Sequence, residues 1–328
     1  MSRHPEGQVP GYRRVPRTAV LAILAAAALL LAACSSSSSS TSGGGSTSSP
    51  SSASAVGKGK SLTLGTKDFT EEFIVGALYK LALQAKGYTV NYKPNIGATE
   101  VIDKALTSGQ IDAYPEYTGE SAVTVAGINT TPTSPQQEYN LAKGFYAKRG
   151  QSMSAMTPFF DTDAIAVTKA YATRYGLKTT ADLKKIPHFT LGARPEFQGR
   201  QQGAAGLEKV YGIHNFTFKS LALGLQYQAL DSGAVNAANV FTTDPQLASG
   251  KYVVLTDPKN VFGFQNIALV INTKKLDELG GQQFMSIINQ VNALLTTPAI
   301  IAMNKAVAID KQQPQDVARA FLSANHVI

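Results

Sequence analysis

The sequence predicts an α/β protein with two similar lobes, and two observations support this fold class. The first is a repeat: residues 105–118 read ALTSGQIDAYPEYT and residues 229–242 read ALDSGAVNAANVFT, with six of fourteen positions identical. In both copies an apolar helix end meets Ser-Gly, and a short strand then ends in an aromatic residue followed by Thr. The second is an alternation of strand and helix patterns, which is typical of βαβ units and parallel-rich sheets. Chance recurrence is the alternative explanation of the repeat.

The predicted elements follow one another from residue 62 onward. A short strand at 62–65 precedes a helix whose start has capping-box spacing in Asp68-Phe69-Thr70-Glu71. Further strands are predicted at 88–92, 164–168 and 190–192, helices at 100–107, 137–148 and, broken at Pro298 and Pro314, 282–325, and the segments 206–211, 223–230, 253–256 and 267–272 continue the alternation. Because ligands collect beyond the carboxyl ends of parallel strands, we expect Tyr117 and Phe241 to face one cleft, one from each lobe.

The N-terminal segment has the pattern of an export signal. Arginines at positions 13, 14 and 17 precede the apolar run 19–33, which ends in Leu-Ala-Ala before Cys34. A run of about 15 residues is shorter than the roughly 20 that a spanning helix needs, so residues 1–33 are predicted to be a signal peptide. Cys34 is the only cysteine of the chain, and its position resembles a bacterial lipobox, in which the cysteine is lipidated. An ordinary signal peptide with an incidental cysteine is the alternative.

The residues that follow Cys34 are predicted to form a flexible tether. Residues 34–60 are rich in Ser, Thr and Gly and have almost no apolar side chains with which to form a core. A coil of this length spans roughly 25–30 Å, enough to hold a folded domain near a membrane while leaving it free to reach a membrane partner. The predicted location is therefore outside the cell membrane, anchored to its outer face by lipid.

Composition disfavours several function classes. Without residues 1–33 the formal charge is 26 − 21 = +5, and no basic run alternates with aromatics, so nucleic-acid binding is disfavoured. His188, His214 and His326 are isolated in sequence, and Asp161-Thr162-Asp163 lacks the later residues of a calcium loop. No metal site, cofactor or enzymatic activity is predicted.

Three motifs resemble landmarks of one family. They are GTKDFTE at 65–71, GQIDAYPEYTG at 109–119, and PEF at 195–197 followed by Arg200. In this order they resemble the glycine betaine/choline (quaternary amine) substrate-binding proteins of ABC importers. The resemblance implies a periplasmic-binding-protein-like clamp with two chain crossings, lobe I being 61–162 and 268–328 and lobe II being 163–267. It also implies a monomer that delivers a small amine to an ABC permease and its ATPase.

The resemblance also implies a ligand site. The family surrounds a methylated cation with aromatic rings, whose faces attract a cation that has no N–H to donate. Tyr117 matches one ring of this box and Phe241 a second. Lys67 and Arg200 match the basic residues that meet the ligand carboxylate, and Glu196 matches an acidic neighbour.

Three positions depart from the family pattern. Asp163 and Gln265 stand where the family has tyrosines, and Glu120 stands where it has Thr. Asp163 and Gln265 accept hydrogen bonds, which favours ligands with N–H or O–H groups over a bare trimethylammonium. Glu120 would repel a ligand carboxylate unless Lys67 or Arg200 lies between them.

The site residues also have purely structural alternatives. Tyr117 and Phe241 could be packed aromatics at strand ends, and Arg200 could form an ion pair with Glu196 at i, i+4 on a helix face. Asp163 could be a turn residue. The sequence favours a lipid-anchored solute-binding protein for a zwitterionic or cationic amine of the betaine/choline class, as used in osmoprotectant uptake. The alternatives are another amine solute, such as an amino-acid derivative or polyamine, or a ligand-sensing lipoprotein without transport.

Overall fold

The computed structural model describes residues 56–129 and 132–328, so Cys34, the predicted signal peptide and most of the predicted tether lie outside the described residues. The strands are β1 Ser61–Gly65, β2 Thr89–Lys93, β3 Ala113–Tyr117, β4 Gln151–Met153, β5 Asp163–Thr168, β6 Phe189–Ala193, β7 Phe216–Ser220, β8 Ala237–Phe241, β9 Tyr252–Leu255 and β10 Ile267–Asn272. The α-helices are α1 Thr70–Ala85, α2 Thr99–Thr107, α3 Pro135–Lys148, α4 Lys169–Tyr175, α5 Ala204–Gly206, α6 Gln226–Asp231, α7 Thr273–Glu278, α8 Gln282–Leu294, α9 Thr297–Ala308 and α10 Pro314–Ala324. Short 3-10 and π-helical turns include η1 Glu120–Val125 and η3 Pro195–Gln198.

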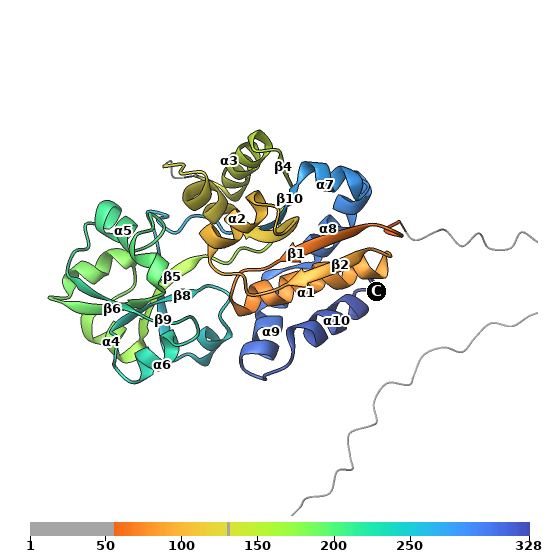
Figure 1. The fold of residues 1–328 in the computed structure, drawn as a ribbon. Coiled ribbons are helices and arrows are strands. Elements are labelled where there is room, and N and C mark those ends of the chain that lie inside the picture. Colours follow the sequence, from red (N-terminus) through yellow and green to blue (C-terminus); the bar gives the residue numbers. More distant parts are fainter. Residues whose placement is uncertain (1–55, 130–131) are drawn as a thin grey trace, which may run out of the picture. The chain divides into compact units, whose positions relative to one another are not determined.

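Two five-stranded sheets have the same topology. One has the strand order β2-β1-β3-β10-β4 and the other β7-β6-β8-β5-β9. In each sheet the first three strands of this order run parallel. The fourth strand pairs antiparallel with the third, as β10 does with β3 and β5 does with β8, and the fifth strand pairs antiparallel with the fourth. Figure 1 shows the second sheet, in green, apart from the first, in orange and blue. The predicted two-lobed α/β fold is confirmed.

The repeat in the sequence corresponds to this duplicated topology. Residues 105–118 contain the end of α2 and the whole of β3, and residues 229–242 contain the end of α6 and the whole of β8. β3 and β8 are the central strands of their sheets. Both copies therefore deliver their terminal aromatic residue from an equivalent place.

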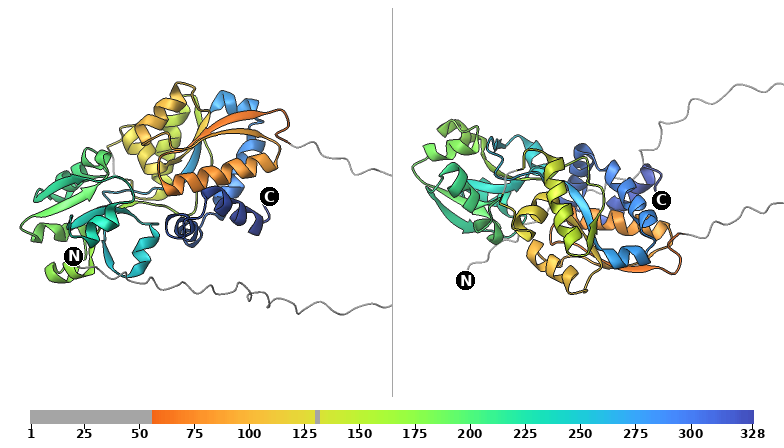
Figure 2. Two further views of the ribbon diagram at one scale, coloured as in Figure 1. Left: turned by 60° about the horizontal axis from the view of Figure 1, so that its bottom comes forward. Right: turned by 90° about the horizontal axis from the view of Figure 1, so that it is seen from above.

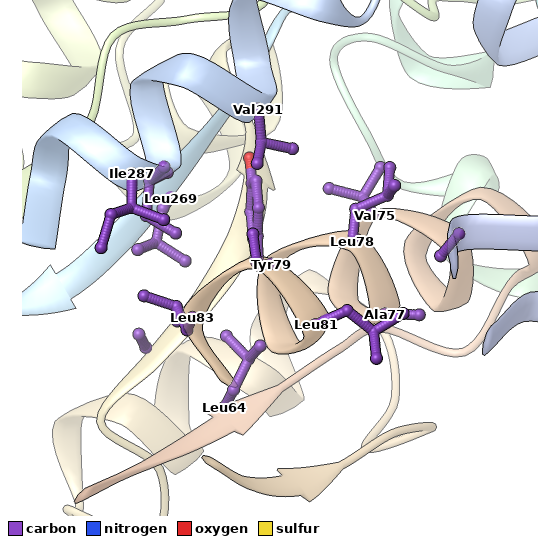
Figure 3. Close-up of a cluster of buried hydrophobic side chains, with 14 of the residues drawn as sticks. Leu64, Val75, Ala77, Leu78, Tyr79, Leu81, Leu83, Leu269, Ile287 and Val291 are labelled. Carbon is purple, nitrogen blue, oxygen red and sulfur yellow. The ribbon is translucent and has the colours of Figure 1, made fainter. Parts of the chain in front are cut away.

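Each sheet is covered on both faces by apolar side chains. In lobe I the larger core lies between the sheet and α1, α8, α9 and α10, which lie together in the views of Figure 2. Leu64, Tyr79, Leu269 and Val291 meet there from β1, α1, β10 and α8 (Figure 3). Tyr79 is fully buried, and its hydroxyl donates to Asn292 Oδ1 at 2.5 Å, which satisfies the polar end of the ring.

No single helix among residues 56–129 and 132–328 is long and apolar enough to cross a membrane. Together the helices α8 and α9 are long and apolar enough, but the chain bends by 86° at the break between them. Buried residues of both helices belong to the core of lobe I.

Two stretches of chain connect the sheets and pair with each other. Phe160 and Asn266 form an isolated antiparallel bridge, and the Asp161 N–H donates to the Gln265 carbonyl at 3.1 Å. The Asn266 amide also donates to the Thr157 and Phe159 carbonyls, at 2.9 Å each. The two crossings thus form one hydrogen-bonded ribbon.

Three local predictions differ from the structure. The capping box at Asp68 is wrong, because α1 begins after Phe69 and no side chain caps its first turn. The predicted tether ends too late, since Gly57 is buried and its N–H donates to the Lys86 carbonyl at 2.9 Å. Ile267 belongs to β10 and hence to the first sheet. We retain the lobe limits near 162 and 267 as a proposal that the strand membership supports.

Candidate functional site

All eight residues singled out by sequence line one cavity of about 60 Å³ between the two sheets. They are Lys67, Tyr117, Glu120, Asp163, Glu196, Arg200, Phe241 and Gln265. Seven further residues complete the wall, namely Asp68, Phe69, Ala98, Thr99, Asp161, Arg194 and Leu223. The structure brings the predicted residues together, and their roles toward a ligand remain proposals.

The apolar side of the cavity is a group of three rings. Tyr117 ends β3 in lobe I and Phe241 ends β8 in lobe II. Phe69, which sequence reasoning missed as a wall residue, lies 5.9 Å from Tyr117 and 5.6 Å from Phe241 between ring centroids. Phe69 and Phe241 are nearly parallel, at 13°. Two rings stacked at so short a separation cannot hold a cation between them, so a ligand must lie against the side of the ring group that faces the cavity.

Lys67 follows β1 and is held by the neighbouring strand β3. Its ammonium is paired with the Glu116 carboxylate and lies 4.9 Å from the centre of the Tyr117 ring. Glu116 is fully buried. Burial raises the pKa of the Glu116 carboxyl, and the Lys67 charge opposes that rise. The Lys67 charge at the cavity is therefore already matched by a carboxylate.

Arg194 is another wall residue that sequence reasoning missed. Its guanidinium donates to both oxygens of Asp163, at 2.6 and 2.9 Å, and to Asn239 Oδ1 at 2.7 Å. It also stacks on Phe241, 5.3 Å from the ring centre. Burial works against the charged guanidinium, but the Asp163 charge and hydrogen bonds outweigh it and raise the pKa of Arg194. The signal for Arg194 was its place directly after the strand β6.

These contacts change the interpretation of Asp163. Its Oδ1 also accepts from the Asn239 amide at 2.8 Å, so both carboxylate oxygens have partners within the protein. Asp163 is thus held by Arg194 and Asn239, and its hydrogen bond to a ligand N–H stays a prediction. Asp163 is not a turn residue either, because it is the first residue of β5 and pairs with Phe241.

Arg200 lies on lobe II and reaches two carboxylates of lobe I. Its Nη1 donates to Glu120 at 2.7 Å, and its Nη2 donates to Glu100 at 3.0 and 3.2 Å. Among the described residues, Glu196 forms no ion pair with it, so the alternative of a helix-face pair is wrong. Burial opposes ionisation of Glu120, but the charges of Arg200, Lys67 and Arg194 prevail and lower its pKa.

Gln265 is held by one hydrogen bond from the backbone and one to a side chain. Its Oε1 accepts from the Glu120 N–H at 3.1 Å, and its amide donates to Gln202 Oε1 at 3.0 Å. A Cβ at Gly119 would lie 2.5 Å from the Gln265 amide nitrogen. The polar atoms of Gln265 are therefore used within the wall, at the position where the resemblance implies a ring.

Buried carboxyls lie behind the rings where the lobes meet. Glu71 on α1 accepts from the hydroxyls of Tyr117 and Thr243, at 2.8 and 2.7 Å, and from the Asn304 amide at 2.8 Å. Asp161 accepts from the Thr243 N–H at 2.9 Å. Burial raises the pKa of both carboxyls. The Glu71–Thr243 hydrogen bond joins lobe I to the loop that follows β8.

The arrangement is suited to non-covalent binding of a small polar cation. Within residues 56–129 and 132–328, no group of three His, Cys, Asp or Glu side chains has the geometry to hold a metal ion. At about 60 Å³ the cavity suits a small ligand.

Comparisons with known proteins agree with this architecture. A glycine-betaine-binding protein of Pseudomonas aeruginosa is 30% identical over 289 residues, which are 84% of this chain and 91% of that protein. Apo YehZ from Escherichia coli has a TM-score of 0.60 at 26% identity, covering 81% of this chain and 99% of its own. A crystal structure of a glycine betaine/carnitine/choline ABC transporter has a TM-score of 0.66 at 24% identity, with coverage of 81% and 99%, and supports the fold.

A family model also matches nearly the whole folded part. It describes the substrate binding domain of the ABC-type glycine betaine transport system, and it matches residues 60–324. That match covers most of the chain, and the P. aeruginosa relative independently reaches 30% identity over most of both proteins. The chain therefore belongs to the substrate-binding domains of ABC-type glycine betaine transport systems.

Proposed function

We propose that this protein captures a small zwitterionic or cationic amine in the cavity between its lobes and delivers it to an ABC permease driven by its ATPase. The observation that carries the proposal is the cavity wall, in which Tyr117 and Phe241, at strand ends of the two lobes, meet Phe69 at the start of α1. The P. aeruginosa relative, named for glycine betaine, supports a methylated amine as ligand. The relatives are transport proteins, which supports a binding role without catalysis.

Ring faces explain why a methylated amine suits this wall. A trimethylammonium cannot donate hydrogen bonds, and its charge is attracted by the electron-rich faces of aromatic rings, by about 0.5–2 kcal/mol for each ring. Tyr117 is 4% exposed, so little of that attraction is screened by bulk water. Tyr117 and Phe241 come from different lobes, so a ligand that touches both stabilises the closed arrangement.

Export and anchoring complete the proposal. The Leu-Ala-Ala-Cys sequence at 31–34 supports lipidation of Cys34 after removal of residues 1–33, and the Ser/Thr/Gly tract supports a tether. The protein would then work as a monomer at the outer face of the cell membrane. Membership of a transport family supports a location outside the cytoplasm.

The test is calorimetric titration with glycine betaine, choline, carnitine, amino acids and polyamines. We expect at least one methylated amine to bind, and Phe241→Ala to weaken it at least tenfold. Phe160→Ala is the matched control, because Phe160 is 42% exposed and lies outside the cavity wall. Absence of binding by every amine, or equal losses from the two Phe→Ala variants, would overturn the proposal.

A further inference from the structure

The positive charges around the cavity are already paired within the protein. Three cationic side chains line it, and each has a carboxylate partner: Lys67 with Glu116, Arg194 with Asp163, and Arg200 with Glu120 and Glu100. In the family resemblance, basic residues at two of these positions receive the ligand's carboxylate. Here that place is occupied by the protein's own anions.

The hydrogen bonds of Arg200 show how protein carboxylates take the place of a ligand carboxylate. A guanidinium binds a ligand carboxylate best through two parallel N–H donors. Both terminal nitrogens of Arg200 donate to protein carboxylates, Nη1 to Glu120 and Nη2 to Glu100. Its buried Nε is the one nitrogen of the group without a hydrogen-bond partner among the described residues. Because Glu100 and Glu120 belong to lobe I, this contact also joins the lobes.

Arg194 offers no substitute. Its two terminal nitrogens donate to both oxygens of Asp163, and one donates to Asn239 as well. Its Nη2 is also 3.7 Å from Glu120, so Glu120 lies between two guanidinium groups. A ligand carboxylate that approached either arginine would have to displace a protein carboxylate and remain beside it, where the two like charges repel.

We propose that this site selects a methylated amine cation that carries no carboxylate, and that Glu120 is the residue that excludes zwitterions. The inference rests on the proposed function and narrows its ligand class. Such a cation needs no basic partner, since the rings attract its charge and the acidic wall residues Asp68 and Glu196 add favourable potential. An uncharged polar group on the ligand, such as an alcohol, avoids the repulsion at Glu120.

The experiment compares choline with glycine betaine, which share the trimethylammonium and differ in an alcohol against a carboxylate. Titration calorimetry of the wild-type protein should give choline a Kd at least tenfold lower. Glu120→Thr places at this position the residue of the related family and releases Arg200 Nη1. In that variant glycine betaine should bind at least tenfold more tightly than in wild type, and choline should bind no more tightly than in wild type.

Two further variants keep the test independent of folding. Glu100→Gln removes the charged partner of Arg200 Nη2 and should therefore also shift the affinity toward glycine betaine relative to choline. The Glu100 side chain is 54% exposed, so this variant should fold normally. Asp103→Asn breaks the Asp103–Arg149 pair of lobe I, away from the cavity, and should leave both affinities unchanged. Wild-type binding of glycine betaine as tight as that of choline overturns the inference and leaves the proposed function standing. If neither of these nor any other amine binds, the proposed function itself fails.

Discussion

Removing Asp163 should destabilise the protein far more than removing an exposed charge. In Asp163→Ala the Arg194 guanidinium loses two charged hydrogen bonds, of 2.6 and 2.9 Å, at a site where its side chain is 9% exposed. Asn239 remains as its neutral partner, and Glu120 remains as a more distant carboxylate at 3.7 Å. Breaking a buried pair by removing one partner costs about 3–5 kcal/mol, because the remaining charge is poorly solvated and has lost its hydrogen-bonded counter-ion.

The expected loss is large enough to measure by two methods. A domain of this size has about 5–15 kcal/mol of stability, so 3–5 kcal/mol is a substantial share of it. The melting temperature should fall by roughly 6–20 °C at 2–4 °C for each kcal/mol, and the urea midpoint should fall with it. Lys251→Ala is the control in the same lobe, since Lys251 pairs with Asp231 with its side chain 66% exposed, and it should cost under about 1 kcal/mol.

A double variant separates the unpaired charge from lost packing. Asp163→Ala combined with Arg194→Leu removes both charges, so it should be more stable than Asp163→Ala alone. If the stability losses of the single variants Asp163→Ala and Arg194→Leu simply add in the double variant, the Asp163–Arg194 pair is not a buried ionic contact. The same conclusion follows if Asp163→Ala costs no more stability than Lys251→Ala. The same argument predicts that Asp163→Tyr, which restores a ring of the related family, impairs folding unless Arg194 is replaced too.

Three further results are expected. Burial raises the pKa of Glu138 from 4.5 to about 7, so between these pH values the folded protein holds a proton there that the unfolded chain has released. The stability that this proton contributes is lost as the pH rises through 7, so Glu138→Gln should gain about 2.5 kcal/mol relative to wild type between pH 5 and 8 in denaturant titrations, and a constant difference would contradict this. Gly119→Ala should displace Gln265 and weaken amine binding at least tenfold in calorimetry, whereas Gly144→Ala, with open space around its Cβ, should not. Cys34→Ala should move the protein from membrane to soluble fractions with the folded part intact; unchanged retention and an unchanged N-terminal mass would rule out lipidation.

The sequence was sufficient to predict the fold class because its signals were local. The helix, Ser-Gly and strand pattern at 105–118 recurs at 229–242, and both copies fold into the same unit at equivalent places in their sheets. The pattern cannot give strand order, because hydrogen bonding between strands depends on neighbours far apart in sequence. The short strand β4, three residues long, was missed since three residues show no alternation.

The candidate site was predicted in position but not in electrostatics. Strand-end reasoning and the family motifs located eight wall residues, and the same strand-end rule applied to β6 would have found Arg194. Asp163 and Arg194 are paired because β6, β8 and β5 are neighbours in that order, which places Asn239 between them. The carboxylates that pair with Arg200, Glu100 and Glu120, belong to the other lobe, so no pattern along the chain reveals these ion pairs.

The place of β10 sets an order in which the two lobes can be completed. All strands of the second sheet lie within residues 163–255, so that sheet has every strand once this continuous stretch exists. The first sheet needs Ile267–Asn272 between β3 and β4, and its helix α1 packs on α10 near the end of the chain. Closing such long loops slows folding, so lobe II should acquire hydrogen-exchange protection before lobe I during refolding. Until β10 arrives, β3 has an unpaired edge in an apolar sheet, which makes the half-finished first lobe the part of the chain most exposed to aggregation.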